Sequence, residues 1–149
     1  MSSSNGEAII PPSNNVARGL ANYPAARKAG SFLFVSGCSS RQPDGTGDDL
    51  MFEHDAEVKP DGTVEFDIQK QTRGVIEKIK EVLKTAGASL ENLVELNVFL
   101  TNMADYNGFN EVYNEYFTEQ GGPARTTVAV KELPHPYIII EIKGIALAP

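Results

Sequence analysis

The stretch DIQKQTRGVIEKIKEVLKTAGASLENLVELNVFLT, residues 67–101, carries the two clearest structural patterns in the chain. In its first part, apolar residues recur every three or four positions, which predicts an amphipathic helix over about 67–86. Asp67 suits the N-cap of this helix, and Gly87 suits the position just after its last turn. Apolar and polar residues then alternate over 93–101, which predicts a β-strand. The basic residues of the helix are expected to form a solvated face: Lys70, Arg73, Lys78, Lys80 and Lys84.

Further elements are predicted on either side of this stretch. A strand at 31–36 precedes Gly37, a second helix covers about 105–118, and two strands at 126–131 and 137–147 close the chain. Two helices among strands in this order indicate an α+β fold, in which both helices pack on one face of a sheet.

The chain has 149 residues, which is the size of a single domain. Residues 1–15 are small and polar, and we expect a loose lead-in with a short strand at 8–10, followed by one domain over 16–149. Residues 41–65 are rich in Asp, Gly and Pro and contain two Pro-Asp-Gly turn signals. They are expected to form a long surface loop.

The charges and the composition exclude several classes of protein. Thirteen basic residues against twenty acidic ones give a net charge of −7, which argues against nonspecific binding to nucleic acids or to anionic membranes. No apolar run approaches the ~18 residues of a membrane span, and no signal peptide is visible, so we expect a cytoplasmic protein. One cysteine and two histidines are too few for a typical zinc site, so no metal is expected.

The last predicted strand contains an anomaly, because Glu141 stands inside a run of isoleucines. An unpaired carboxylate is costly to bury, so Glu141 either alternates out to solvent or has a partner. If Lys131 pairs with Tyr137 in a hairpin, Thr127 faces Glu141, and Arg125 lies on the same face. An arginine beside a glutamate predicts a small-molecule site, where the arginine binds a carboxylate and the glutamate handles a proton or a water. A structural salt bridge or a one-residue slip in register would remove that site.

The remaining candidates for catalysis are weaker. Cys38 has no histidine within six residues and is expected to be structural or incidental. His54 falls in the acidic loop and is expected in solvent, and His135 stands between two prolines in a rigid turn.

Several motifs resemble the RidA (YjgF-type) family of enamine/imine deaminases. They are PARTTVAVKELP at 123–134, IEIKGIA at 140–146, Tyr23 standing thirteen residues before the serine of FVSG, and VELNVFLTNMADYNGFNEVYNEYF at 94–117. Within the family, three segments are similar to the branch of 2-aminomuconate deaminases: NYPAARKAGSFLFVSGCSSRQPD, RTTVAV and LPHP. The long loop at 41–65 also resembles that branch.

The resemblance implies a chorismate-mutase-like fold with a mixed, mainly antiparallel sheet, assembled as a homotrimer with active sites between subunits. It implies no metal and no organic cofactor, and it implies small amino or imino carboxylates as partners. The carboxylate-binding arginine of the family falls on Arg125, and its water-positioning glutamate falls on Glu141. The family's site-lining residues fall on Tyr23, Ser36 and Asn110. Gly37, Cys38 and Thr127 complete the expected substrate-binding set.

One departure from the family is Thr127, because many members have a cysteine two residues after the arginine. The resemblance thus implies hydrolytic deamination of 2-aminomuconate to 4-oxalocrotonate and ammonia, without a thiol role at this position. Arg41, or a basic residue of a neighbouring subunit, is a candidate to meet the second carboxylate of such a substrate. Three alternatives stay open: a general deaminase of 2-aminoacrylate and related compounds, an endoribonuclease or translation inhibitor, and a non-catalytic trimer that binds small carboxylates.

Overall fold

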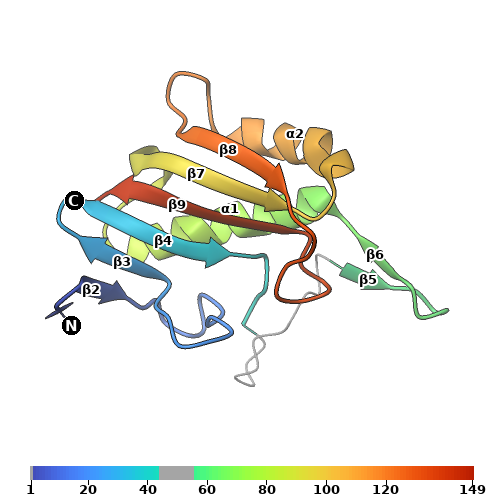
Figure 1. Ribbon diagram of the computed structural model, residues 1–149, viewed down its shortest axis with the longest axis horizontal. Coiled ribbons are helices and arrows are strands. Elements are labelled where there is room, and N and C mark those ends of the chain that lie inside the picture. The colour runs from blue at the N-terminus through green and yellow to red at the C-terminus, as the bar shows by residue number, and fades with distance from the viewer. Residues whose placement is uncertain (1, 44–55) are drawn as a thin grey trace.

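The computed structural model describes residues 2–43 and 56–149, and its main feature is a seven-stranded sheet. The strands lie in the order β1-β2-β3-β4-β9-β7-β8 (Figure 1). Their bounds are β1 Ser2–Ser3, β2 Gly6–Ile9, β3 Ala26–Ala29, β4 Phe32–Cys38, β9 Ile140–Leu147, β7 Leu93–Leu100 and β8 Ala124–Ala129. Every neighbouring pair is antiparallel except β7 and β8, which are parallel. The sheet is therefore mixed and mainly antiparallel, as expected.

Helix α1, Ile68–Thr85, confirms the first predicted helix and its caps. The Asp67 carboxylate accepts hydrogen bonds from the backbone N–H groups of Gln69 and Lys70, at 2.9 and 3.1 Å, which satisfies donors that the first turn leaves open. Gly87 has a φ of +77°, a conformation that favours glycine after a helix.

Helix α2, Tyr106–Tyr116, lies beside α1 on the same face of the sheet (Figure 1). The Arg73 guanidinium of α1 forms a salt bridge with Glu115 of α2 at 2.7 Å, and the Tyr116 hydroxyl donates to Glu77 at 3.0 Å. Short 3-10 turns precede β7 at Leu90–Asn92 and α2 at Met103–Asp105. Both helices thus cover one face of the sheet, which confirms the predicted α+β architecture.

The core lies between that face and the two helices. Its fully buried side chains include Leu33, Leu96, Leu100, Ile140, Ile142, Ile76, Leu83 and Phe109. The side-chain amide of Gln71, on α1, is also fully buried and bridges two backbone groups just before β9. Its Nε2 donates to the carbonyl of Tyr137 at 2.8 Å, and its Oε1 accepts from the N–H of Ile139 at 3.1 Å. The Gln71 amide thus satisfies backbone groups just before β9 in the way that a neighbouring strand would.

The predicted hairpin between the last two strands is wrong, because β7 lies between β8 and β9. Thr127 is opposite Val98 of β7, and Glu141 is opposite Phe99, so Thr127 and Glu141 are not paired. The cause is the parallel pairing of β7 with β8. Parallel neighbours need a crossover connection, which α2 supplies, and β9 then pairs with the other edge of β7.

Three segments are more ordered than expected. The short strand expected at 8–10 is part of β2, but the rest of the lead-in is less loose than expected, because residues 2–3 form β1 and β2 begins at Gly6. Strand β2 pairs with β3, which was not predicted. Within the expected loop at 41–65, β5, Ala56–Val58, and β6, Val64–Phe66, form a two-stranded sheet that projects from the body of the molecule (Figure 1). Its turn contains the second Pro-Asp-Gly signal, with Gly62 at a φ of +88°. Asp44 and Gly45 of the first signal lie outside the described residues, and so does His54.

The face of the sheet opposite the helices is partly apolar. Phe32 and Phe34 of β4 are 42% and 46% exposed on this face. The alternating residues Leu33 and Val35 point the other way and are buried under the helices. The residue paired with Phe32 is Leu147, which is 48% exposed. No helix covers this face within residues 2–43 and 56–149. We refer to it as the open face.

Candidate functional site

Arg125 is held on the helix-covered face of the sheet by side chains of α2. It is opposite the buried Leu96 in the register of β7 and β8, so it points toward the helices. Its Nη1 donates to Asn110 Oδ1 at 2.9 Å, and its Nη2 donates to the Tyr106 hydroxyl at 3.0 Å. The guanidinium carries five N–H groups. The bonds to Asn110 and Tyr106 use two of them and a side-chain hydrogen bond with Tyr113 uses a third, which leaves two N–H groups. They remain available for an anion.

Three aromatic rings surround the same guanidinium. Its Cζ lies 4.6 Å from the ring centre of Tyr113, 5.0 Å from that of Phe109 and 5.7 Å from that of Tyr106. Ring faces attract a cation, most strongly where water is scarce. Burial raises the pKa of the Tyr113 hydroxyl, while the positive charge of Arg125 opposes that rise. We call Arg125, Asn110 and these three aromatic residues the arginine cluster.

Thr127 lies two residues along β8 from Arg125 and shares its face, as predicted. Its partner in the register is the buried Val98. The Thr127 hydroxyl oxygen is buried, and it has no hydrogen-bond partner among residues 2–43 and 56–149. A hydroxyl in this position can donate to or accept from a ligand beside Arg125.

Glu141 projects toward the open face, because its neighbours Ile140 and Ile142 are fully buried on the helix side. The side chain is half-buried and passes across Gly37 of β4. A Cβ added at Gly37 would lie 3.0 Å from the Glu141 Cδ and 3.1 Å from its Oε2. The register of β4 against β9 shifts between Val35 and Cys38, which brings Gly37 under the carboxyl. Only glycine leaves that space open.

A cavity of about 230 Å³ lies beside this carboxyl, and it contains five of the residues expected to form the site. We call it the glutamate cavity. Its polar and ionisable lining residues include Tyr23, Ser36, Cys38, Ser39, Arg41, Lys78 and Glu141, together with Gly37.

The hydrogen-bonding role of Ser36 and the protonation state of Cys38 follow from their surroundings. The Ser36 hydroxyl donates to the carbonyl of Pro24 at 2.8 Å, so it faces a ligand as an acceptor. Burial raises the pKa of the Cys38 thiol to about 11, and Glu141 adds to the rise while Lys78 and Arg41 oppose it. The thiol is therefore protonated at neutral pH, and Cys38 lines the cavity without serving as a nucleophile.

Glu141 has the electrostatic environment of a proton-transfer group. Burial raises the pKa of its carboxyl, and the positive charges of Arg41 and then Lys78 oppose that rise. A carboxylate with a raised pKa is a stronger base toward water than an ordinary surface glutamate. The arrangement suits a group that orients a water molecule and accepts its proton.

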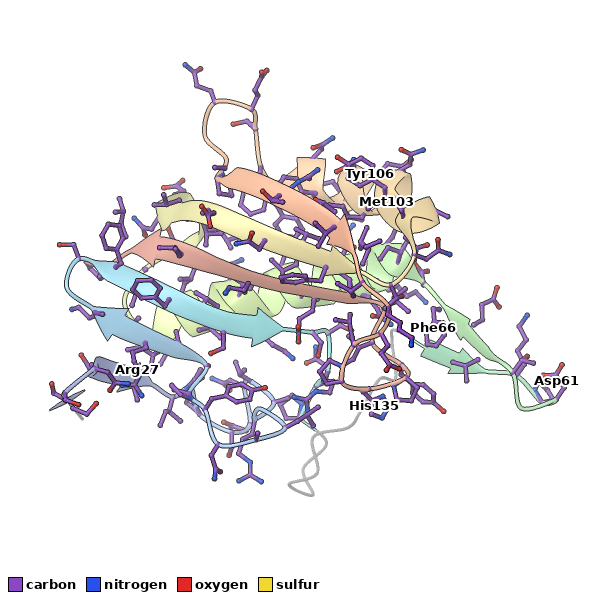
Figure 2. The ribbon with its side chains drawn as sticks, in the orientation of Figure 1. Arg27, Asp61, Phe66, Met103, Tyr106 and His135 are labelled. Carbon is purple, nitrogen blue, oxygen red and sulfur yellow. The ribbon has the colours of Figure 1, made fainter. Side chains whose placement is uncertain are left out.

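The predicted meeting of Arg125 and Glu141 on one face of one chain is wrong. Arg125 points to the helix-covered face, Glu141 points to the open face, and β7 separates their strands. Figure 2 shows Tyr106, of the arginine cluster, on α2 near the β8 edge, and Arg27 on β3 toward the other edge. The predicted residues therefore form two groups, Arg125, Asn110 and Thr127 in one, and Tyr23, Ser36, Gly37, Cys38 and Glu141 in the other.

Lys78 and Tyr106 also belong to the site, and neither was predicted as a site residue from the sequence. Lys78 was expected on the solvated face of α1, but it is 8% exposed and lines the glutamate cavity. It follows Val75 by three residues and precedes Val82 by four, so the helical spacing already placed it on the buried stripe. Tyr106 was assigned to the apolar stripe of α2, and nothing in its spacing shows that its hydroxyl meets Arg125.

Within residues 2–43 and 56–149, no three His, Cys, Asp or Glu side chains group in a way that would hold a metal ion. No helix in this part of the chain has the length and apolar character to cross a membrane.

Comparisons with known proteins agree with the geometry. The model of the family described as Endoribonuclease L-PSP matches residues 14–148. The mitochondrial protein mmf2 of Schizosaccharomyces pombe is 41% identical over 112 residues, which are 75% of each chain. The 3-aminoacrylate deaminase RutC of Acinetobacter baylyi is 38% identical over 127 residues, which are 85% of this chain and 87% of that one.

Solved structures show the same fold. The crystal structure of E. coli TdcF with bound serine aligns with a TM-score of 0.72 and 27% identity, over 94% of this chain and 98% of that one. The fold and the family that the motifs predicted are thus confirmed, whereas closeness to the 2-aminomuconate deaminases stays a prediction. The chain belongs to the endoribonuclease L-PSP family, which it shares with the RutC proteins.

Proposed function

We propose that this protein is a hydrolytic deaminase of enamine and imine carboxylates, and that its substrate is 2-aminomuconate, which it converts to 4-oxalocrotonate and ammonia. The observation that carries the proposal is the arginine cluster. Asn110, Tyr106 and Tyr113 fix the Arg125 guanidinium, and they leave two of its five N–H groups for a ligand. Such a fork binds a carboxylate by two parallel hydrogen bonds.

The relatives support the reaction class. One relative's name, 3-aminoacrylate deaminase, states that it removes an amino group from an unsaturated amino acid. TdcF was solved with serine, which has a carboxylate next to an amino-bearing carbon. Both ligands present the group that Arg125 is placed to bind.

The complete site forms between copies of the chain. Arg125 and Glu141 cannot share a ligand within one chain, because they project from opposite faces of the sheet. The open face carries exposed Phe32, Phe34 and Leu147, which a neighbouring copy would cover. In a homotrimer, the arginine cluster of one copy meets the glutamate cavity of the next, and three equal sites result.

The reaction needs proton transfers and one water. Arg125 binds the carboxylate beside the amino-bearing carbon, and the enamine takes up a proton on carbon to become the iminium form. Glu141 accepts a proton from water as the new C–O bond forms to the former C=N carbon. It then returns the proton to the nitrogen, and the C–N bond breaks as the new hydroxyl group loses its proton to solvent, which balances the proton taken up on carbon. Ammonia leaves and a 2-oxo acid remains. The sum is enamine plus water to oxo acid plus ammonia, and no oxidant or reductant is consumed.

The other residues shape this site in the proposal. Asn110 orients the arginine, Thr127 offers its hydroxyl beside it, and Ser36 accepts a hydrogen bond on the glutamate side. Tyr23 and Cys38 line the cavity, while Gly37 leaves room for the Glu141 carboxyl. The scheme uses no metal and no organic cofactor, and the protein acts in the cytoplasm without nucleic-acid or membrane partners.

The name of the relative RutC favours a second candidate, a deaminase of small enamines in general, such as 2-aminoacrylate. The family description favours a third, an endoribonuclease, although the net charge of −7 argues against RNA as a substrate. A non-catalytic trimer that binds small carboxylates is the fourth.

One set of assays separates these candidates. Freshly generated 2-aminomuconate and 2-aminoacrylate are supplied in turn, and ammonia release is followed with wild-type protein, Arg125→Ala and the exposed control Lys80→Ala. We expect release from 2-aminomuconate to fall at least a hundredfold in Arg125→Ala and to stay unchanged in the control. Full activity of Arg125→Ala would overturn the proposal. RNA cleavage lost in Glu141→Ala, or binding of carboxylates without any ammonia, would replace it.

A further inference from the structure

The partners of Arg125 in the arginine cluster lie along one stripe of α2. They are Tyr106, Phe109, Asn110 and Tyr113, at positions i, i+3, i+4 and i+7 of the helix. Residues with this spacing share one face of a helix, and Arg125 contacts that face from β8. Tyr106 is the first residue of α2, so it lies at the end of the stripe, near the β8 edge of the sheet (Figure 2).

The hydrogen bond between Arg125 and Tyr106 has a fixed direction. A guanidinium can only donate, so the Tyr106 oxygen accepts from the Arg125 Nη2 at 3.0 Å. The tyrosine hydroxyl also carries one proton of its own, which therefore points away from the guanidinium. Among residues 2–43 and 56–149, no group accepts that proton. Tyr106 thus has a donor to offer to a ligand.

The Tyr106 hydroxyl is also accessible and held in place. Tyr106 is 36% exposed, whereas Tyr113, the other tyrosine that bonds Arg125, is 7% exposed. The Tyr106 ring packs beside Phe109, with ring centres 6.5 Å apart. A tyrosine side chain has only two χ angles, so these contacts fix it at a low cost in entropy. Its proton therefore stays beside the guanidinium and within reach of a small molecule.

We infer that Tyr106 is a substrate-binding residue, whose hydroxyl donates a hydrogen bond to the same carboxylate that Arg125 binds. The inference rests on the proposed function, because it takes Arg125 as the site of the carboxylate beside the amino-bearing carbon. An ionised carboxylate has two oxygens with about four positions for hydrogen bonds. The two N–H groups left on Arg125 fill two of these positions, and the Tyr106 O–H fills a third.

This arrangement favours ionised carboxylates as the ligand class. The Asn110 Oδ1 and both tyrosine oxygens already accept from the guanidinium, so the protons of the cluster are what remains for a ligand. A hydrogen bond to a charged acceptor is roughly twice as strong as one between neutral groups. An ester or an amide in the same place has less negative charge on its oxygens, so it gains less from the three donors.

Binding of crotonate, an unreactive unsaturated carboxylate, tests the inference without any turnover. NMR titration gives its dissociation constant for wild-type protein, Tyr106→Phe and the control Tyr116→Phe. Binding should weaken about tenfold in Tyr106→Phe, as expected for the loss of a hydrogen bond to a charged group. The control removes a hydroxyl of the same helix, one that donates to Glu77, and should keep the wild-type value. Equal affinities of wild type and Tyr106→Phe, or no binding to wild type, would overturn the inference.

A double-mutant cycle separates direct contact from positioning. If Tyr106 acted only by fixing Arg125, Tyr106→Phe would change nothing once the arginine is gone. The cycle uses Arg125→Met, because methionine still packs against aromatic rings, and each variant is checked for a native circular-dichroism spectrum. Adding Tyr106→Phe to Arg125→Met should weaken crotonate binding by a further factor of about three. No further loss would overturn the inference and make Tyr106 a positioning residue.

A signal of the wild-type protein gives the same answer without any change at Arg125. In protein with isotope-labelled tyrosine rings, the Cζ signal that Tyr106→Phe removes belongs to Tyr106. Crotonate should move this signal downfield, because the hydroxyl then donates to a charged oxygen, and should leave the Tyr116 signal in place. A Tyr106 signal that stays in place at saturating crotonate would overturn the inference.

Turnover separates this inference from the proposed function. In Tyr106→Phe, KM for 2-aminomuconate should rise about tenfold, with a smaller change in kcat, because a binding contact is lost. If wild-type protein deaminates neither 2-aminomuconate nor 2-aminoacrylate, yet Tyr106→Phe weakens crotonate binding as expected, the proposed function fails and the role of Tyr106 stands. If the protein is a deaminase and Tyr106→Phe changes neither KM nor crotonate affinity, the role of Tyr106 fails and the deaminase stands.

Discussion

Arg125 and Glu141 project from opposite faces of the same sheet, and the strand β7 runs between the strands that carry them. In the proposed trimer, each chain therefore holds the arginine half of one site and the glutamate half of another. Complementation between inactive variants measures this directly.

We expect Arg125→Ala and Glu141→Ala each to be inactive alone, and their mixture to recover activity after unfolding and refolding together. In a trimer with three equal interfaces, a site is intact when a Glu141→Ala chain supplies its Arg125 and an Arg125→Ala chain supplies its Glu141. Random assembly of a one-to-one mixture restores this at about one quarter of the sites. Ammonia release at about a quarter of the wild-type rate is the expected result. No recovery, with trimers shown by light scattering, would place both residues in one chain's site.

The acidic limb of the pH–rate profile should belong to Glu141. Burial raises the pKa of its carboxyl, so the carboxylate is lost at a higher pH than about 4.3, the ordinary value for glutamate. The rate should fall as pH drops through this raised pKa, and the fall should be absent from the residual activity of Glu141→Gln. Because Arg41 lowers the same pKa, Arg41→Met should move the limb to higher pH. A limb that stays in place in Arg41→Met but moves in Lys80→Met would contradict this assignment.

The same pKa predicts how stability depends on pH. A carboxyl whose pKa is raised by folding destabilises the folded state once it ionises, and this cost is complete above the raised pKa. Glu141→Gln should therefore raise Tm relative to wild type at pH 8. The gain should shrink as pH falls and vanish below the unfolded value. Differential scanning calorimetry at equal protein concentration checks both the direction and the pH range.

Gln71→Leu should destabilise the fold even though it replaces a buried polar side chain with an apolar one of similar size. The substitution leaves the Tyr137 carbonyl and the Ile139 N–H without their side-chain partner in the core, which costs about 1–3 kcal/mol for each orphaned group. Urea unfolding at fixed protein concentration measures the loss. The exposed Gln120→Leu serves as the control, with an expected change within about 0.5 kcal/mol. Equal effects of the two substitutions would show that the bridge does not stabilise the fold.

Cys38 should resist alkylation in the native protein. Its buried thiol has a pKa raised to about 11, so the reactive thiolate is on the order of a thousandth of the population at pH 8. Mass spectrometry should find no label on Cys38 after iodoacetamide treatment under native conditions and full label in urea. Rapid native labelling would show that the cavity opens to reagents far more than its burial indicates.

The sequence predicted those elements whose signals are local. The helix α1 has a regular apolar stripe and a cap at each end, and α1 confirmed the helix together with Asp67 and Gly87. The strand β3, ARKA, has two basic residues and no apolar alternation, so no local pattern distinguishes it from a loop. It becomes a strand because β2 and β4 pair with both of its edges.

The candidate site was predicted in its residues but not in its geometry. Glu141 was predicted from its place inside a run of isoleucines and Arg125 from the expected hairpin, and the family motifs named the same two residues. Motifs keep their order along any chain, whereas the face of each residue depends on which strands are neighbours. A pairing between distant strands, such as β7 with β9, leaves no local mark, and the shorter connection between β8 and β9 made a hairpin the natural expectation. Lys78 shows the opposite case, because its spacing from Val75 and Val82 indicated burial although its charge indicated exposure.

The enclosure of Arg125 by α2 also affects the entropy of binding. An exposed arginine samples many rotamers, and immobilising such a side chain on a ligand costs about 0.5–1.5 kcal/mol. Here two hydrogen bonds and three rings restrict those rotamers before any ligand arrives. Folding has already imposed that loss of freedom, so a carboxylate meets a preorganised guanidinium. The side chains of α2 therefore contribute to affinity by fixing Arg125, even where they do not contact the ligand themselves.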